Sequence, residues 1–145
     1  MGLIEGLGDG PTGVDTSIFI YLLEEHPRFL PLVMPMFESA DAGARQLVTS
    51  TLTLLEVLVV PYRSGDMQLA ERYERTLSHS RGVTMIPLTR NQLRAAAQLR
   101  ALTGMRTPDA LQIAAALGGG CQTFVTNDRR LADVPGLRIV QLSDY

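Results

Sequence analysis

The sequence predicts an α/β fold in which helices cover both faces of a mostly parallel central sheet. Short apolar strand candidates alternate with longer helical segments along the whole chain, and such alternation is typical of parallel sheets. The length of 145 residues favours one domain with one core. Hydrophobic residues make up 46% and charged residues 19%, which is typical of a globular protein and excludes a disordered chain.

The first part of the chain contains two predicted strands and three predicted helices. Gly- and Pro-rich residues 6–13 indicate an irregular lead-in over residues 1–13, before a first strand that ends near Asp15. We expect irregularities at Pro31 and Pro35, and Pro61 leaves the end of the third helix open. The predicted helices span residues 17–25, 29–42 and 52–63, and the second strand spans residues 46–50.

The second part of the chain contains three further strands and four further helices. Leu69, Tyr73 and Leu77 recur every four residues, which indicates one face of a helix, and the glycines at 118–120 end a later helix. No repeat or long linker divides the chain, so residues 14–145 are predicted to form one domain. The predicted strands span residues 83–88, 122–125 and 137–141, and the helices span residues 67–80, 91–102, 107–117 and 128–131.

The composition excludes several classes of site and location. Cys121 is the single cysteine, so no internal disulfide can form, and we expect it to be a small core residue. Cys121, His26 and His79 lack the spacing of a zinc site. The first ten residues lack an export signal, and the longest apolar runs are too short to span a bilayer, so a cytoplasmic location is expected.

Four carboxylates each lie in or beside a run of apolar residues: Asp15, Glu56, Asp109 and Asp128. Acids this close to a core are costly unless something pairs with them. The chain has no lysine, and no arginine lies within four positions of Asp15 or Glu56. A divalent cation bound by several of these acids would compensate the cost, and such a group is typical of a metal-dependent nuclease.

The predicted elements bring three of these acids to one edge of the sheet. Asp15 and Asp128 follow predicted strands, and Asp109 lies at a helix start that returns to the same edge. In parallel sheets, ligands bind outside the carboxyl ends of the strands. We therefore expect the three aspartates to face one another.

Each aspartate also has an alternative structural role as a helix cap. Asp15 precedes a predicted helix, and Asp128 would begin a short one. Asp109 follows Thr107 and Pro108, where Thr is a good N-cap and Pro suits the first helical position. Both roles remain open for each aspartate at this point.

Glu56 has no such cap role. Leu52, Val59 and Val60 lie on its own helical face, so the pattern predicts that Glu56 is partly buried. The alternative is a glutamate at the edge of the apolar stripe that reaches water.

Charge is distributed unevenly along the chain. Residues 1–61 hold eight acidic residues and two arginines, and residues 62–145 hold seven acidic residues and eleven arginines, giving net charges of −6 and +4. The arginines either face a phosphate backbone or form a solvated surface. Arg106 either contacts a phosphate, pairs with Asp109 or is exposed, and Arg129 and Arg130 leave the same alternatives.

Four motifs in order carry a family resemblance: Val-Asp-Thr-Ser-Ile-Phe-Ile at 14–20, Leu-Thr-Leu-Leu-Glu-Val at 52–57, Arg-Thr-Pro-Asp-Ala-Leu-Gln-Ile-Ala-Ala-Ala at 106–116 and Phe-Val-Thr-Asn-Asp-Arg-Arg-Leu at 124–131. Together they resemble a PIN domain, and within that family the VapC-type ribonuclease toxins of type II toxin–antitoxin systems. The resemblance covers nearly the whole chain from Val14. One departure is the sequence before Asp15, where only Val14 is clearly apolar.

The resemblance implies a three-layer α/β/α sandwich and an Mg²⁺- or Mn²⁺-dependent endoribonuclease. Its acids match Asp15, Glu56, Asp109 and Asp128, and its supporting polar positions match Ser17 and Thr126. It also implies a small antitoxin partner and a homodimer.

Our hypothesis for these acids is that Asp15 and Asp109 are the principal ligands and that Asp128 serves a second cation or its waters. Glu56 would act on the nucleophilic water. A non-toxin PIN nuclease of RNA processing and a catalytically silent PIN-like binding module are the alternatives. A phosphatase of the haloacid dehalogenase type would require a second Asp two positions after Asp15, where this chain has Ser17, so this class is set aside.

Overall fold

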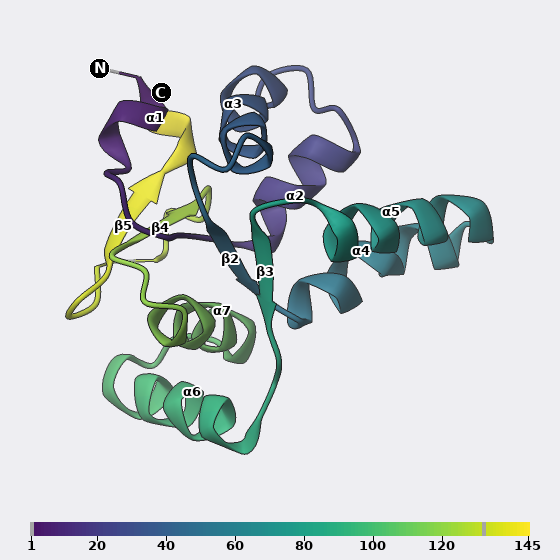
Figure 1. The fold of residues 1–145 in the computed structure, drawn as a ribbon. Helices are drawn as coiled ribbons and strands as arrows, with labels where there is room; N and C mark the ends of the chain where they lie inside the picture. The colour runs from purple at the N-terminus through teal and green to yellow at the C-terminus, as the bar shows by residue number, and fades with distance from the viewer. Residues whose placement is uncertain (1, 132) are drawn as a thin grey trace.

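The computed structural model describes residues 2–131 and 133–145, and its centre is a five-stranded sheet (Figure 1). The strand order is β3-β2-β1-β4-β5, and all four neighbouring pairs are parallel. The α/β class predicted from the sequence is confirmed. The strands are β1 (Thr12–Val14), β2 (Leu47–Ser50), β3 (Val83–Ile86), β4 (Thr123–Thr126) and β5 (Arg138–Gln141).

Helices flank this sheet, and most begin and end within two residues of the predicted bounds. They are α1 (Leu3–Gly6), α2 (Thr16–Leu23), α3 (Leu30–Asp41), α4 (Leu52–Arg63), α5 (Met67–His79), α6 (Arg90–Thr103) and α7 (Thr107–Gly118), followed by the 3₁₀ turn η1 (Leu142–Asp144). Among the described residues, none of the helices has the length and apolar character needed to cross a lipid bilayer.

Alternating side chains of the buried strands form two apolar cores. Val14 and Val125 belong to the larger core, which includes side chains of α1 to α5. Phe124 and Val48 belong to the second core, with Ile113 of α7. Helices α6 and α7 lie together below the sheet in Figure 1, whereas α1, α2 and α3 lie above it. The period of two along each strand thus gives three layers.

α7 packs very closely against β1 at Gly13. A Cβ atom added at Gly13 would lie 2.7 Å from the Cβ of Ala116 and 2.8 Å from Cδ2 of Phe124. Only glycine therefore fits at this point of the central strand. The close contact explains the glycine in the weakly apolar stretch before Asp15, and it allows α7 to lie close to the end of β1.

Two predicted features differ from the structure. The lead-in predicted as irregular contains α1, and Leu3 and Leu7 pack in the larger core. The helix predicted at residues 128–131 is a turn, because the Asp128 carboxylate accepts the backbone N–H of Arg130 at 2.9 Å. Such local side-chain bonding competes with helix formation.

α7 begins at Thr107 as predicted, but the alternative in which Thr107 caps the helix is wrong. The N-cap is Arg106, with extended backbone and no side-chain cap bond, and Thr107 is already the first helical residue. Pro108 nevertheless lies in the first turn, where its missing N–H costs little. Pro35 and Pro61 are accommodated inside α3 and α4, and α4 ends at Arg63 as predicted.

Candidate active site

All four predicted acids line one open cavity of about 500 Å³: Asp15, Glu56, Asp109 and Asp128. The cavity lies at the carboxyl ends of β1 and β4. Within the sheet, β2 lies beside β1 on one edge and β4 lies beside β1 on the other edge, so the order of the strands reverses at β1. This is a topological switch point, where parallel sheets open a crevice.

Asp15 follows the last residue of β1 and caps α2. One carboxylate oxygen accepts the backbone N–H of Ser17 at 3.0 Å and also the Ser17 hydroxyl, and the other accepts the Thr126 hydroxyl. Its cap role and its position in the cavity therefore coexist. Loss of hydration raises the pKa of the Asp15 carboxyl, although the bonds from Ser17 and Thr126 act in the opposite direction.

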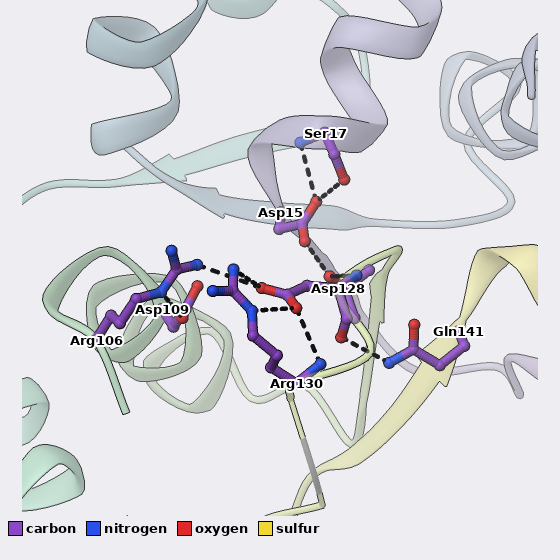
Figure 2. Close-up of polar contacts among 8 residues, drawn as sticks. Asp15, Ser17, Arg106, Asp109, Asp128, Arg130 and Gln141 are labelled. Carbon is purple, nitrogen blue, oxygen red and sulfur yellow. Dashed lines mark hydrogen bonds and ion pairs between the residues drawn. The ribbon is translucent and has the colours of Figure 1, made fainter. Parts of the chain in front are cut away.

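Two arginines hold the acids on the other side of the cavity (Figure 2). Arg130 forms two bonds to Asp128, from Nε at 3.0 Å and from an Nη at 2.9 Å. Arg106 bridges Asp109 at 3.1 Å and Asp128 at 3.3 Å. Of the roles left open for Arg106, the structure thus shows pairing with Asp109 on a side chain that is 56% exposed.

The arginines also set the charge state of Asp128. Hydrogen bonds from Arg130 hold the pKa of the Asp128 carboxyl below its usual range, and the nearby charge of Arg106 adds to the effect. The Asp128 carboxylate is thus paired with the guanidinium groups of Arg106 and Arg130.

Glu56 lies on α4 and is partly buried, as its apolar neighbours predicted. Those neighbours are not the cause, because Val59 is 40% and Val60 is 53% exposed. One oxygen of Glu56 instead accepts the Thr16 hydroxyl of α2 at 2.6 Å. Within the described ranges, neither Glu56 nor Asp15 forms an ion pair.

The motif analysis assigned no role to three polar residues that line the same cavity, Thr16, Tyr21 and Gln112. Gln112 lies one helical turn after Asp109 on α7, and its amide donates to the Thr16 hydroxyl at 3.2 Å. Only 4% of Gln112 is exposed. A glutamine three positions after a candidate acid, inside an otherwise apolar helix, was the signal in the sequence that could have identified it.

The donor chemistry of the cavity fits a hard divalent cation. Carboxylate oxygens are the ligands that Mg²⁺ and Mn²⁺ prefer. Within residues 2–131 and 133–145, however, no three acidic, histidine or cysteine side chains lie close enough together to share one ion in their present positions. Arg106 and Arg130 pair with Asp109 and Asp128 instead, so a cation would compete with these guanidinium groups.

Residues 14–137 match the sequence profile of the PIN domain family. No curated protein matches the chain at the sequence level. The matched residues include all four acids that line the cavity.

Several solved structures share the fold at low sequence identity. A toxin–antitoxin complex from Klebsiella pneumoniae is 19% identical with a TM-score of 0.66, and the match covers 92% of this chain and 98% of that one. VapBC2 from Rickettsia felis, bound to a promoter DNA fragment, is 18% identical with a TM-score of 0.69 and covers 90% and 97%. The sarcin–ricin loop cleaving toxin VapC20 from Mycobacterium tuberculosis is 18% identical with a TM-score of 0.62 and covers 78% and 86%.

Proposed function

Because this chain belongs to the PIN domain family, we propose that it is a metal-dependent endoribonuclease and the toxin of a toxin–antitoxin pair. The observation that carries the proposal is the convergence of four carboxylates in one cavity at the β1–β4 switch point. Residues 14–145 would form the nuclease domain, in a cytoplasmic protein. The structural neighbours named as toxins support the toxin assignment.

The cavity would hold one or two divalent cations, Mg²⁺ or Mn²⁺. Asp15 and Asp109 are the proposed principal ligands, and Asp128 would serve a second cation or its waters. When bound, the cation supplies charge stabilisation at the phosphate and lowers the pKa of a bound water. Ser17 and Thr126 support this role of Asp15, because their hydroxyls fix both of its oxygens.

The remaining polar side chains would act on the water and the phosphate. Glu56, held by Thr16, would orient the attacking water and accept its proton. Arg106 and Arg130 are exposed at the mouth of the cavity, and either guanidinium can turn from an aspartate to a phosphate oxygen. The phosphodiester bond then breaks by attack of water, and neither histidine takes part.

The proposed partners are an RNA substrate, a small antitoxin protein and a second copy of the chain in a homodimer. The antitoxin is supported by the neighbours, which include complexes described as toxin–antitoxin or VapBC assemblies. A test is whether expression of this chain arrests growth and whether a small protein gene lies next to its own gene and relieves the arrest when co-expressed. Absence of arrest with retained RNA cleavage would favour a non-toxin PIN nuclease.

The direct test is cleavage of total RNA by the purified protein with Mg²⁺, with Mn²⁺ or with EDTA. We expect cleavage that needs a cation and that Asp109→Asn lowers at least about 100-fold. Asp41→Asn, an exposed acid at the end of α3, is the matched control and should cleave normally. Equal cleavage by Asp109→Asn would contradict the proposed site. No cleavage, together with no cation binding in calorimetry, would favour the silent binding module.

A further inference from the structure

A buried hydrogen-bond network lies beneath the acid cavity and joins α2, α4, α7 and β2. Its centre is the side-chain amide of Gln112, which bonds to the Thr49 and Thr53 hydroxyls, the Thr16 hydroxyl and the backbone of Ser50. Thr49, Ser50 and Thr53 are each at most 1% exposed. Buried polar groups of this kind are costly unless all are satisfied, so the network is specific to one arrangement of side chains.

The backbone of β2 fixes the orientation of the amide. The N–H of Ser50 lies 3.2 Å from Oε1 of Gln112, and a backbone N–H can only donate. The oxygen of the amide must therefore face β2. The amide nitrogen then faces the other way and donates to Thr16 at 3.2 Å and to Thr53 at 2.9 Å.

This orientation directs the hydroxyl proton of Thr16. Because Oγ1 of Thr16 accepts a hydrogen from Gln112, its own hydrogen is free for Glu56, whose Oε1 lies 2.6 Å away. Thr49 donates to Gln112, which leaves the 2.7 Å bond between Thr49 and Thr53 to be donated by Thr53. In this assignment each of these hydroxyl and amide hydrogens has one acceptor, and the 3.2 Å contact between the Thr16 and Thr53 hydroxyl oxygens has no hydrogen between them.

From this geometry we propose that Gln112 is a positioning residue that holds the Glu56 carboxylate in place through Thr16. The inference rests on the proposed nuclease function, in which Glu56 acts on the water. Gln112 lies one helical turn after Asp109 on α7, so the same helix would set the positions of a metal ligand and of the proton acceptor. An apolar side chain could fill the same space but could not direct the Thr16 hydroxyl.

The test is a double-mutant cycle on RNA cleavage by the full chain with Mn²⁺. Thr16→Val and Gln112→Met each break the path from Gln112 to Glu56 at nearly constant volume, and Gln112→Met also removes the bonds to Thr49, Thr53 and the Ser50 backbone. Each should lower kcat about tenfold or more, with KM for RNA changed less than about threefold, because only the geometry of the reacting groups is lost. The double variant should be no slower than the slower single variant, because both changes break one relay. Multiplied losses, or a normal kcat in Thr16→Val, would overturn the proposal.

Two further variants separate positioning from stability. Thr16→Ser keeps the hydroxyl and should restore kcat to within about threefold of the wild type. Thr123→Val removes another buried hydroxyl, one that bonds the Leu7 carbonyl at the opposite end of β4. It should lower the melting temperature without lowering kcat. A loss of kcat in Thr123→Val equal to that in Gln112→Met would assign both effects to stability and overturn the proposal.

A structural measurement, which does not depend on catalytic activity, tests this inference separately from the proposed function. In crystal structures of the metal-free Thr16→Val and Gln112→Met variants, the Glu56 side chain should leave the position it has in the wild type. An unchanged Glu56 in both variants would overturn the relay even if the wild-type protein cleaves RNA. An inactive wild-type protein would overturn the nuclease proposal, and the crystal structures alone would then decide the role of Gln112.

Discussion

At the scale of single residues, the cavity contains two kinds of acid. Asp109 and Asp128 are paired with arginines that are more than half exposed, whereas Asp15 and Glu56 are held by hydroxyl groups. From the lack of basic residues near Asp15 and Glu56 along the chain, the sequence predicted a bound cation, and the family resemblance implied the supporting roles of Ser17 and Thr126 but not that of Thr16. For Asp109 and Asp128, pairing with an arginine was one of several open alternatives. An arginine that lies beside an acid in the sequence can point to solvent as easily as to the acid.

Arg130 should compete with a cation for Asp128. Its guanidinium occupies both carboxylate oxygens, so Arg130→Gln should bind Mn²⁺ more tightly than the wild type, by up to about fivefold for an exposed pair. Calorimetric titration of the metal-free proteins measures this. Arg129→Gln is the matched control, because Arg129 bonds to Ser143 and Asp144 and to none of the four acids. Equal affinity in wild type and Arg130→Gln would show that the pairing does not oppose the cation.

Asp15 should destabilise the metal-free fold as the pH rises. Its pKa is raised in the folded state, so ionisation is easier in the unfolded chain, and stability is lost as the pH rises through the folded pKa. Asp15→Asn cannot ionise and keeps an oxygen for Ser17. The melting temperature of the variant minus that of the wild type, measured in EDTA, should therefore be larger at pH 7 than at pH 4.

The opposite shift of Asp128 does not disturb this comparison. Because the pKa of Asp128 is lowered in the folded state, ionised Asp128 stabilises the fold above its unfolded pKa, and this contribution is lost as the pH falls. The contribution is the same in the wild type and in Asp15→Asn, so it cancels in the difference between their melting temperatures. A difference in melting temperature that is constant between pH 4 and pH 7 would contradict the prediction for Asp15.

At the scale of elements, hydrophobic periodicity located most helices and strands but not every buried face. The bounds of α4 agree with the prediction, yet Leu55, Val59 and Val60 on this helix are exposed. A pattern reports which residues share a face, and tertiary packing decides which face is covered. The same limit explains Leu3 in α1 and Leu7 directly after it, which become core residues only because segments distant in the sequence pack against them.

The contact between α7 and β1 gives a prediction about one glycine. Gly13→Ala should lower the free energy of unfolding by about 1–3 kcal/mol, because the new methyl group would overlap Ala116 and Phe124. Urea denaturation of the two proteins measures the change. Gly10→Ala, where a Cβ meets nothing within 4 Å, should change the stability far less. Equal stability of Gly13→Ala and wild type would mean that α7 can move away from β1 at little cost.

At the scale of the whole molecule, the convergence of the acids was predictable and the order of the strands was not. Alternating strands and helices place all carboxyl ends at one edge of a sheet, and this alone brought Asp15, Asp109 and Asp128 together. That β1 lies between β2 and β4 depends on long-range packing, which a local pattern does not report. The Gln112 network was missed for the same reason, because its members come from four elements.

The position of β1 between β2 and β4 also has a consequence for biosynthesis. Thr12 pairs with Thr123, so about 110 further residues must be made before the centre of the sheet can close. A chain still emerging from the ribosome carries Asp15 and Glu56, but Asp128 joins them only after β4 has been translated. The four acids therefore cannot share one cavity until the chain has been made through β4 and Asp128.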